Sequence, residues 1–367
     1  MKITPTLSLY LARLYTGNFL LIGFILLGIV YLFDTVELLR RASKRDDIPM
    51  SLIFEMGLYK LPEVGQIILP FAVLFSAIFT FWLLSRRSEL VIVRAAGFSV
   101  WQFLAPVMGV AAMIGLLQMG MINPVGAIML AKYETLESQT LMVGEKDLVT
   151  LFDKGLWLRQ MLPDHQGYVI LHAEKIILPS WEMKDVMALF FGPDDNFLKR
   201  IDAGGAGLGS GEWLFKGALV HQPQQKVESH PQLTLPTSLT PDDIEESFSS
   251  PMAHSFWKLP TYIKTLSETG FDVTKLRIHF HSLLAQPILF MAMVLLAAAV
   301  SLRPPRFQRT FALIASGVLI GFLVFFISSF LQALGTSQQI PVLLAAWSPS
   351  VVTLLLGVAV MLGLEDG

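Results

Sequence analysis

Two clusters of charged side chains are the parts of this sequence most able to do chemistry. The first lies in ELLRRASKRDD (37–47). Its cations are Arg40, Arg41, Lys44 and Arg45. Guanidinium and ammonium groups favour an anionic ligand, with phosphate as the best match for a guanidinium. The competing interpretation is an anchor at a membrane surface, partly neutralised by Glu37, Asp46 and Asp47.

The second cluster is SRRSELVIVRAAGFS (85–99). We expect a short helix here, capped by Ser85 and ended by Gly97. Its apolar side chains are Leu90, Val91, Val93 and Ala96, next to Glu89 and Arg94. Such a surface predicts a docking site for a partner that pushes on the membrane part of the protein. The alternative is an ordinary basic loop that follows a membrane span.

Motifs for enzymatic chemistry are missing from the sequence. It contains no G-x-x-x-x-G-K-[ST], no G-x-S-x-G and no H-E-x-x-H, and it has no cysteine. His279 and His281 form an H-F-H, but two ligands are too few for a metal site, so we interpret them as interfacial histidines. The net charge of −2 gives no basic field for nucleic acid. We therefore expect a non-catalytic protein without cofactor, metal or nucleic-acid partner.

Long apolar runs place these clusters in a membrane protein. The sequence is 53% apolar and 15% charged, with a mean hydropathy of +0.59. Six runs are long enough to cross a bilayer as helices. They are 14–34, 65–84, 100–122, 282–302, 311–333 and 340–364. Pro70, Pro106, Pro287 and Pro349 lie inside them, where we expect local kinks, and the absence of internal charges disfavours a proton-coupled carrier.

The distribution of Lys and Arg predicts the orientation. With a cytoplasmic N-terminus, that side holds the larger set of cations: Lys2, Arg13, Arg86, Arg87, Arg94, Arg303, Arg306 and Arg309. The opposite side holds Arg40, Arg41, Lys44, Arg45 and Lys60. Both termini are therefore expected in the cytoplasm and the long insert outside it.

The insert 123–281 is largely polar and carries the signals of short strands. In GYVILHAEKII (167–177), Val169, Leu171 and Ala173 fall on one face. Similar runs at 155–160, 182–191 and 212–220 are separated by Gly-rich and Asp-rich turns, which predicts an antiparallel sandwich or open roll. LPTYIKTLSETG (259–270) predicts a short helix ended by Gly270.

The chain resembles the lipopolysaccharide export permeases LptF/LptG. The resemblance rests on three spans, a β-rich insert and three more spans, together with RSELVIVRAAGF (87–98). LPEVGQIILPFAVLFSAIFT (61–80) and the stretch 238–287 support it. RSEL, the AGF ending and the short tail LEDG are most like the G-type permease of that family.

The resemblance implies a polytopic helical membrane protein of the inner membrane, with a periplasmic β-jellyroll-like domain between helices 3 and 4. It implies spans in 1–122, that domain in 123–281 and the last spans in 282–367. In this family, permeases F and G pair around a cavity, and a separate cytoplasmic ATPase dimer, the B component of the exporter, binds ATP and docks from below. Lipopolysaccharide is extracted from the inner membrane and passes through the β-domain into a bridge begun by the membrane-anchored periplasmic C component.

Residue by residue, the resemblance implies three sites. The coupling helix for the ATPase maps onto 86–98, with Arg86, Arg87, Glu89, Leu90, Val93, Arg94, Gly97 and Phe98. The phosphate-facing cations map onto Arg40 and Arg41, with Lys44 and Arg45 as additions. The third site is the cargo-lining face of Val169, Leu171 and Ala173. Relatives can carry a cation deeper in the first span, whereas this chain has Tyr31, Phe33 and Asp34 there.

Other interpretations stay open at this point. The chain could be the paralogous F-type permease, or a membrane-anchored periplasmic scaffold or receptor, although six spans exceed what an anchor needs. A membrane-embedded hydrolase or transferase lacks a plausible nucleophile or acid–base set.

Overall fold

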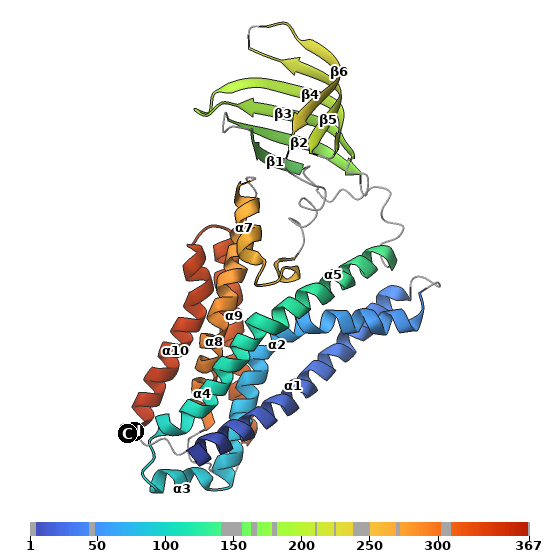
Figure 1. The fold of residues 1–367 in the computed structure, drawn as a ribbon. Coiled ribbons are helices and arrows are strands. Elements are labelled where there is room, and N and C mark those ends of the chain that lie inside the picture. The colour runs from blue at the N-terminus through green and yellow to red at the C-terminus, as the bar shows by residue number, and fades with distance from the viewer. Residues whose placement is uncertain are drawn as a thin grey trace. The chain divides into compact units, whose positions relative to one another are not determined.

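The computed structural model describes residues 5–43, 48–140, 156–162, 167–177, 182–209, 211–223, 225–237, 250–268, 272–301 and 310–365. The chain divides into two compact units, which are considered separately here (Figure 1). The helical unit comprises Met1–Leu136, Pro251–Leu259 and Thr274–Gly367, and the β unit comprises Glu137–Ser250 and Pro260–Val273.

In the described part of the chain, six helices are long and apolar enough to cross a membrane, which confirms the six predicted spans. They are α1 (Pro5–Ala42), α2 (Met50–Arg86), α4 (Val100–Leu117) continued by α5 (Asn123–Thr140), α8 (Thr274–Ser301), α9 (Thr310–Thr336) and α10 (Val342–Glu365). A π-helical turn, η1 (Gln118–Ile122), joins α4 to α5 without interrupting the rod. The shorter elements are α3 (Glu89–Ala95), η4 (Pro251–Ala253) and α7 (Leu259–Glu268).

Several helices extend beyond the apolar runs that predict them. The first ends at Ala42 instead of 34, the second begins at Met50 instead of 65, and α5 continues beyond 122. An apolar run marks only the part of a helix that lies in hydrocarbon. The polar residues of the same helix can continue beyond it into water. Consequently, the sheet occupies only part of the predicted insert. Gly270, the expected end of α7, lies outside the described residues.

Helix α8 forms the centre of the helical unit. It packs against α2, α4 and α10, and its small residues Ala292, Ala297 and Ala298 are fully buried. Gly115 of α4 meets Pro287 of α8 so closely that a Cβ at position 115 would lie 2.6 Å from the Pro287 Cα. A side chain at position 115 would force these two helices apart, because backbone atoms cannot yield.

The β unit is one antiparallel sheet in sequence order. Its strands are β1 (Leu156–Met161), β2 (Tyr168–Ile177), β3 (Glu182–Phe191), β4 (Phe197–Leu208), β5 (Glu212–His221) and β6 (Glu228–Pro236). Alternate residues of every strand point to one buried face, which gathers into a single apolar cluster. The predicted antiparallel β-domain between the third and fourth spans is therefore confirmed.

One buried glutamine shows that this sheet is rolled. Strands β1 and β6 are the two outer strands of the sheet. Nevertheless, Gln160 of β1 donates from Nε2 to the Pro236 carbonyl oxygen of β6 at 2.7 Å. The Trp213 Nε1–H of β5 donates to Gln160 Oε1 at 3.1 Å. A flat sheet would hold these strands far apart, so the sheet curls until its edges meet at Gln160. Of the two predicted forms, the described strands adopt the roll.

The first prediction concerns this edge contact. Replacing Gln160 by Leu leaves a buried indole N–H and a carbonyl oxygen without partners, at a cost of about 1–3 kcal/mol. In the full-length protein, we expect amide hydrogen exchange of β1 and β6 to accelerate about tenfold or more, while α8 stays unchanged. Gln232→Leu, an exposed position of β6, is the matched control. If β1 and β6 exchange as slowly in Gln160→Leu as in the unaltered protein, the Gln160 contact does not hold the roll closed.

Candidate functional sites

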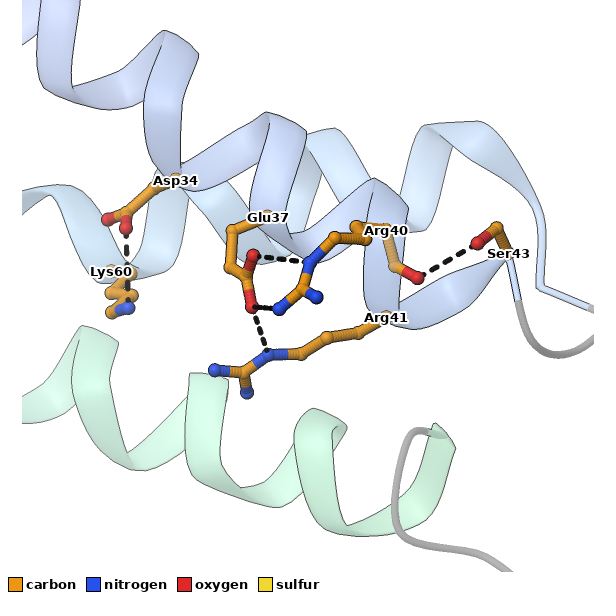
Figure 2. Close-up of polar contacts among 6 residues, drawn as sticks. All are labelled: Asp34, Glu37, Arg40, Arg41, Ser43 and Lys60. Carbon is orange, nitrogen blue, oxygen red and sulfur yellow. Dashed lines mark hydrogen bonds and ion pairs between the residues drawn. The ribbon is translucent and has the colours of Figure 1, made fainter.

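The arginine cluster at the end of α1 is held by one carboxylate. Glu37 accepts from Arg40 Nε at 2.8 Å and from Arg40 Nη2 at 2.7 Å, which is a bidentate pair (Figure 2). It also accepts from Arg41 Nε at 3.2 Å. These contacts span one helical turn, as (i, i+3) and (i, i+4) pairs. Ser43 Oγ donates to the Arg40 carbonyl oxygen and completes the end of the helix.

Exposure decides what this cluster can do. The side chains of Arg40, Arg41 and Glu37 are 73%, 50% and 41% exposed. Ion pairs at such exposure contribute only about 0–1 kcal/mol. Glu37 therefore orients both guanidiniums without removing them from solvent, and an incoming anion can compete for the same donors. Lys44 and Arg45, predicted as further cations of this site, lie outside the described residues.

A further cation near this cluster was not predicted as a site residue. Lys60 of α2 places its Nζ 3.5 Å from the Asp34 carboxylate of α1 (Figure 2). The same Nζ lies 5.8 Å from the centre of the Tyr133 ring of α5. The sequence contains Asp34 where relatives can carry a cation, and in the structure that carboxylate is paired with Lys60. The sequence indicated only that residues 34, 37 and 41 share one face of a helix, because they are three and four residues apart. It did not indicate that Lys60 lies beside Asp34.

Helix α3, expected from the sequence to dock a partner, begins later than predicted. Ser85 does not cap it, because α2 continues through Arg86. The chain turns at Ser88, whose φ of 58 breaks the helix, and the Ile92 N–H donates to the Ser88 carbonyl oxygen at 3.2 Å. The apolar sequence that precedes the turn favours one more turn of α2 over an early cap.

The predicted end of α3 at Gly97 is confirmed. Gly97 has a φ of +81, and the Phe98 N–H donates to the Val93 carbonyl oxygen at 3.3 Å. Together these features form a Schellman motif, in which a left-handed glycine lets the chain close over the last carbonyls. Ser99 then caps α4 and exchanges hydrogen bonds with Gln102 in a capping box.

The structure divides the apolar residues of α3 between two faces. Leu90 is buried in the core of the helical unit and Val93 packs against it. Val91 and Ile92 are 65% and 66% exposed on the other side. Sequence reasoning missed Ile92, although the helical period already separates 91, 92 and 95 from 90 and 93. Val91 and Ile92, rather than Leu90 and Val93, are thus available to a partner.

Charged residues in and beside α3 also contact neighbouring side chains. Glu89 accepts a hydrogen bond from the Tyr10 hydroxyl of α1 at 2.9 Å and lies 3.9 Å from Arg87 Nη1. The Arg86 guanidinium lies over the Trp82 ring, 5.2 Å from its centre. Arg94 belongs to α3, but its side chain is outside what the structure describes. Phe98 is half-buried between α3 and α4.

Val169, Leu171 and Ala173 lie together on the inner face of the roll, each with 0% of its surface exposed. They belong to a packed cluster with residues from all six strands. In this closed form, other side chains fill the space that a cargo would need. The neighbouring His172 lies on the outer face, where its ring stacks on Trp157 at 4.1 Å between ring centres.

No group of three His, Asp or Glu side chains that could hold a metal ion occurs among the residues described. His279 and His281, predicted as interfacial, lie inside α8, and each has a buried ring nitrogen without a hydrogen-bond partner there.

Comparisons with known proteins match nearly the whole chain. A family model described as "Lipopolysaccharide export system permease LptF/LptG" covers residues 9–363. The chain is 26% identical over 352 residues to the lipopolysaccharide export system permease protein LptG of Haemophilus influenzae, covering 94% of this chain and 95% of that protein. It is 24% identical over 356 residues to LptG of Escherichia coli K12, covering 94% of each. The chain therefore belongs to the LptF/LptG family of lipopolysaccharide export permeases.

Proposed function

We propose that this chain is the G-type permease of a lipopolysaccharide exporter driven by a separate ATPase. The family match over residues 9–363 carries this proposal, and the relatives named LptG favour G over the paralogous F. Six spans with a β roll between the third and fourth supply the elements such a permease needs. The chain itself contains no P-loop motif that would bind ATP.

In the proposed orientation, both termini and α3 face the cytoplasm, and the β unit lies in the periplasm. The partners are an F-type permease, a dimer of the ATPase beneath α3, and the membrane-anchored C component at the exit. Arg40 and Arg41 hold phosphates of the lipid, α3 transmits the stroke of the ATPase, and the roll receives the acyl chains. These three steps are tested separately below.

The docking step predicts that Ile92→Asp lowers co-purification of the ATPase about tenfold or more, because an exposed apolar contact becomes a buried charge. Glu89→Lys is expected to act in the same direction. Tyr10→Phe removes the hydrogen bond to Glu89 but keeps its charge, and Val227→Asp places the same change at an exposed site in the β unit. Both controls should retain the ATPase. If Tyr10→Phe and Glu89→Lys lower co-purification of the ATPase equally, Glu89 acts only by holding α3 in place within the chain.

The anion step predicts that the double variant Arg40→Gln/Arg41→Gln weakens lipopolysaccharide binding about 100-fold or more. Each charge-assisted contact to a phosphate contributes roughly 1.5–3 kcal/mol. Arg200→Gln removes a guanidinium that is also paired with a carboxylate, but in the β unit, and should have no effect. Binding is measured on the purified complex by crosslinking to the lipid.

The variant Glu37→Gln distinguishes lipid binding by Arg40 and Arg41 from a purely structural role of the cluster in α1. If Glu37 competes with the lipid for the guanidiniums, its removal leaves binding equal or tighter. A loss in Glu37→Gln as large as that in the arginine variant would mean that the three residues act only as a structural anchor of α1.

The conduit step predicts that a small aliphatic diazirine side chain at Leu171 captures lipopolysaccharide only while the ATPase turns over. The closed roll buries Leu171 completely, so capture requires opening. The same probe at the outward His172 should capture none. Gln160→Leu, which frees the edges, should raise capture at 171 further. Capture without ATP, or equal capture at both positions, would leave the β unit as a docking module.

A further inference from the structure

A cavity of about 310 Å³ lies within the helical unit, between α2, η1, α8, α9 and α10. Five of the described side chains that line it carry a buried polar atom without a hydrogen-bond partner. These atoms are Gln118 Oε1, His279 Nε2, Ser282 Oγ, Gln286 Oε1 and Ser328 Oγ. Gln118 is only 1% exposed. We refer to this space as the hydroxyl cavity.

Thr35 Oγ1, His281 Nδ1 and Ser301 Oγ are also unbonded in the helical unit, but these three residues do not line the cavity. Gln66 also lines the cavity, yet its Oε1 accepts from Asn123 Nδ2 at 3.1 Å. Asn123 Oδ1 in turn accepts from the Phe256 N–H at 2.7 Å. Buried polar groups in native proteins are nearly always bonded, so five orphans around one space point to an occupant that bonds them.

Three helix prolines lie at or beside the cavity. Pro70 and Pro349 line it, and Pro287 follows the lining residue Gln286. A proline inside a helix has no N–H for the carbonyl four residues earlier. The carbonyls concerned belong to Gln66, Leu283 and Ala345. The π-helical turn that begins at Gln118 is a fourth irregularity at the same place. Three of the four prolines predicted as local kinks, Pro70, Pro287 and Pro349, thus lie at one site.

The charge of the lining restricts the occupant. Apart from His279, none of the described lining residues is ionisable, and no Asp, Glu, Lys or Arg is among them. An ion or a phosphate held here would be a charge without a partner in a medium of low dielectric constant. The occupant is therefore neutral. A hydroxyl group both donates and accepts, which matches two serine hydroxyls together with amide oxygens that only accept.

The remaining walls add an apolar requirement. Phe71, Leu289, Met293 and Val324 line the cavity, and the lining residues Ile67 and Phe325 are 41% and 44% exposed at the surface of the helical unit. The cavity therefore lies next to the surface of the bundle along α2 and α9, where the Phe71 and Phe325 rings pack with their centres 5.8 Å apart. Water would satisfy the polar end but leave these apolar walls in contact with water, whereas a hydrocarbon chain covers them.

We propose that the hydroxyl cavity binds an uncharged amphiphile, a lipid-like alcohol that enters from the membrane between α2 and α9. Its hydroxyl group bonds to the cluster around Gln118, Ser282 and Gln286, and its chain lies against Phe71 and Val324. The volume is at the lower end of the range typical for small-molecule sites. This site uses no charged contact, so it is independent of the Arg40 and Arg41 cluster and of the proposed export function.

Photolabelling with 3-azioctanol tests the proposal on the full-length protein in phosphatidylcholine nanodiscs, whose lipid has no free hydroxyl. We expect labels on lining residues of α2, α8 or α9, competed by octanol but not by octane or octanoate. The O-methyl ether of the probe should label at least tenfold less. Labelling by the ether equal to that by the alcohol would overturn the hydroxyl role, and the absence of competable labelling would mean a cavity that holds water only.

In a variant that lacks two of the orphaned atoms, labelling and the thermal unfolding temperature should change in opposite directions. Gln286→Leu/Ser328→Ala should reduce labelling at least tenfold and, without ligand, raise the thermal unfolding temperature, because two orphaned polar atoms are removed. Gln339→Leu/Ser316→Ala makes the same exchanges outside the lining and should change neither. If the first variant fails to fold, octanol must still raise the unfolding temperature of the unaltered protein where octane does not. If Gln286→Leu/Ser328→Ala folds and is labelled as strongly as the unaltered protein, the proposed site is wrong.

Discussion

The helical unit depends on one constraint, that polar groups buried in a bilayer have to be bonded by the protein itself. Long uninterrupted helices satisfy this constraint for the backbone, and α8 meets its neighbours through small residues that let helices approach closely. The Gly115–Pro287 contact shows how little space remains between α4 and α8. Against this background, a group of prolines, a π-helical turn and five unbonded side-chain atoms around one cavity is a concentrated departure from the rule.

The same constraint is relaxed at the end of α1, where the side chains reach solvent. There, the pairing of Glu37 with Arg40 and Arg41 contributes little to stability, because exposed ion pairs are nearly balanced by hydration. Its effect is geometric, since two long and mobile side chains are held on one side of the helix. A phosphate carries more charge and more acceptor oxygens than one carboxylate. In the proposed function, such a ligand replaces Glu37 as the partner of both guanidiniums without any change in the helix.

The sequence was sufficient for features encoded locally. Apolar runs located six spans, alternation located four of the six described strands but missed β4 and β6, and Gly97 located the end of α3. Features that depend on packing between distant segments were out of reach. The face of α3 that binds the bundle is decided by helices before and after it, so Leu90 and Val93 were assigned to the wrong side. The Asp34–Lys60 pair and the Gln160 bridge join residues on different elements. The cavity combines residues from α2, η1, α8, α9 and α10, each ordinary in its own segment.

Closure of the β unit by side chains has a physical consequence for passage through it. Had β1 and β6 been joined by a ladder of backbone hydrogen bonds, opening would break every bond along the seam at once. In the described strands the edges are instead bridged by Gln160, with Trp213 and Pro236 as its partners, over an inner face that is wholly apolar around Leu171. Opening then costs a few hydrogen bonds and the exposure of apolar surface. If an acyl chain enters the roll, as the proposed function requires, it covers that surface again and offsets part of the cost of opening.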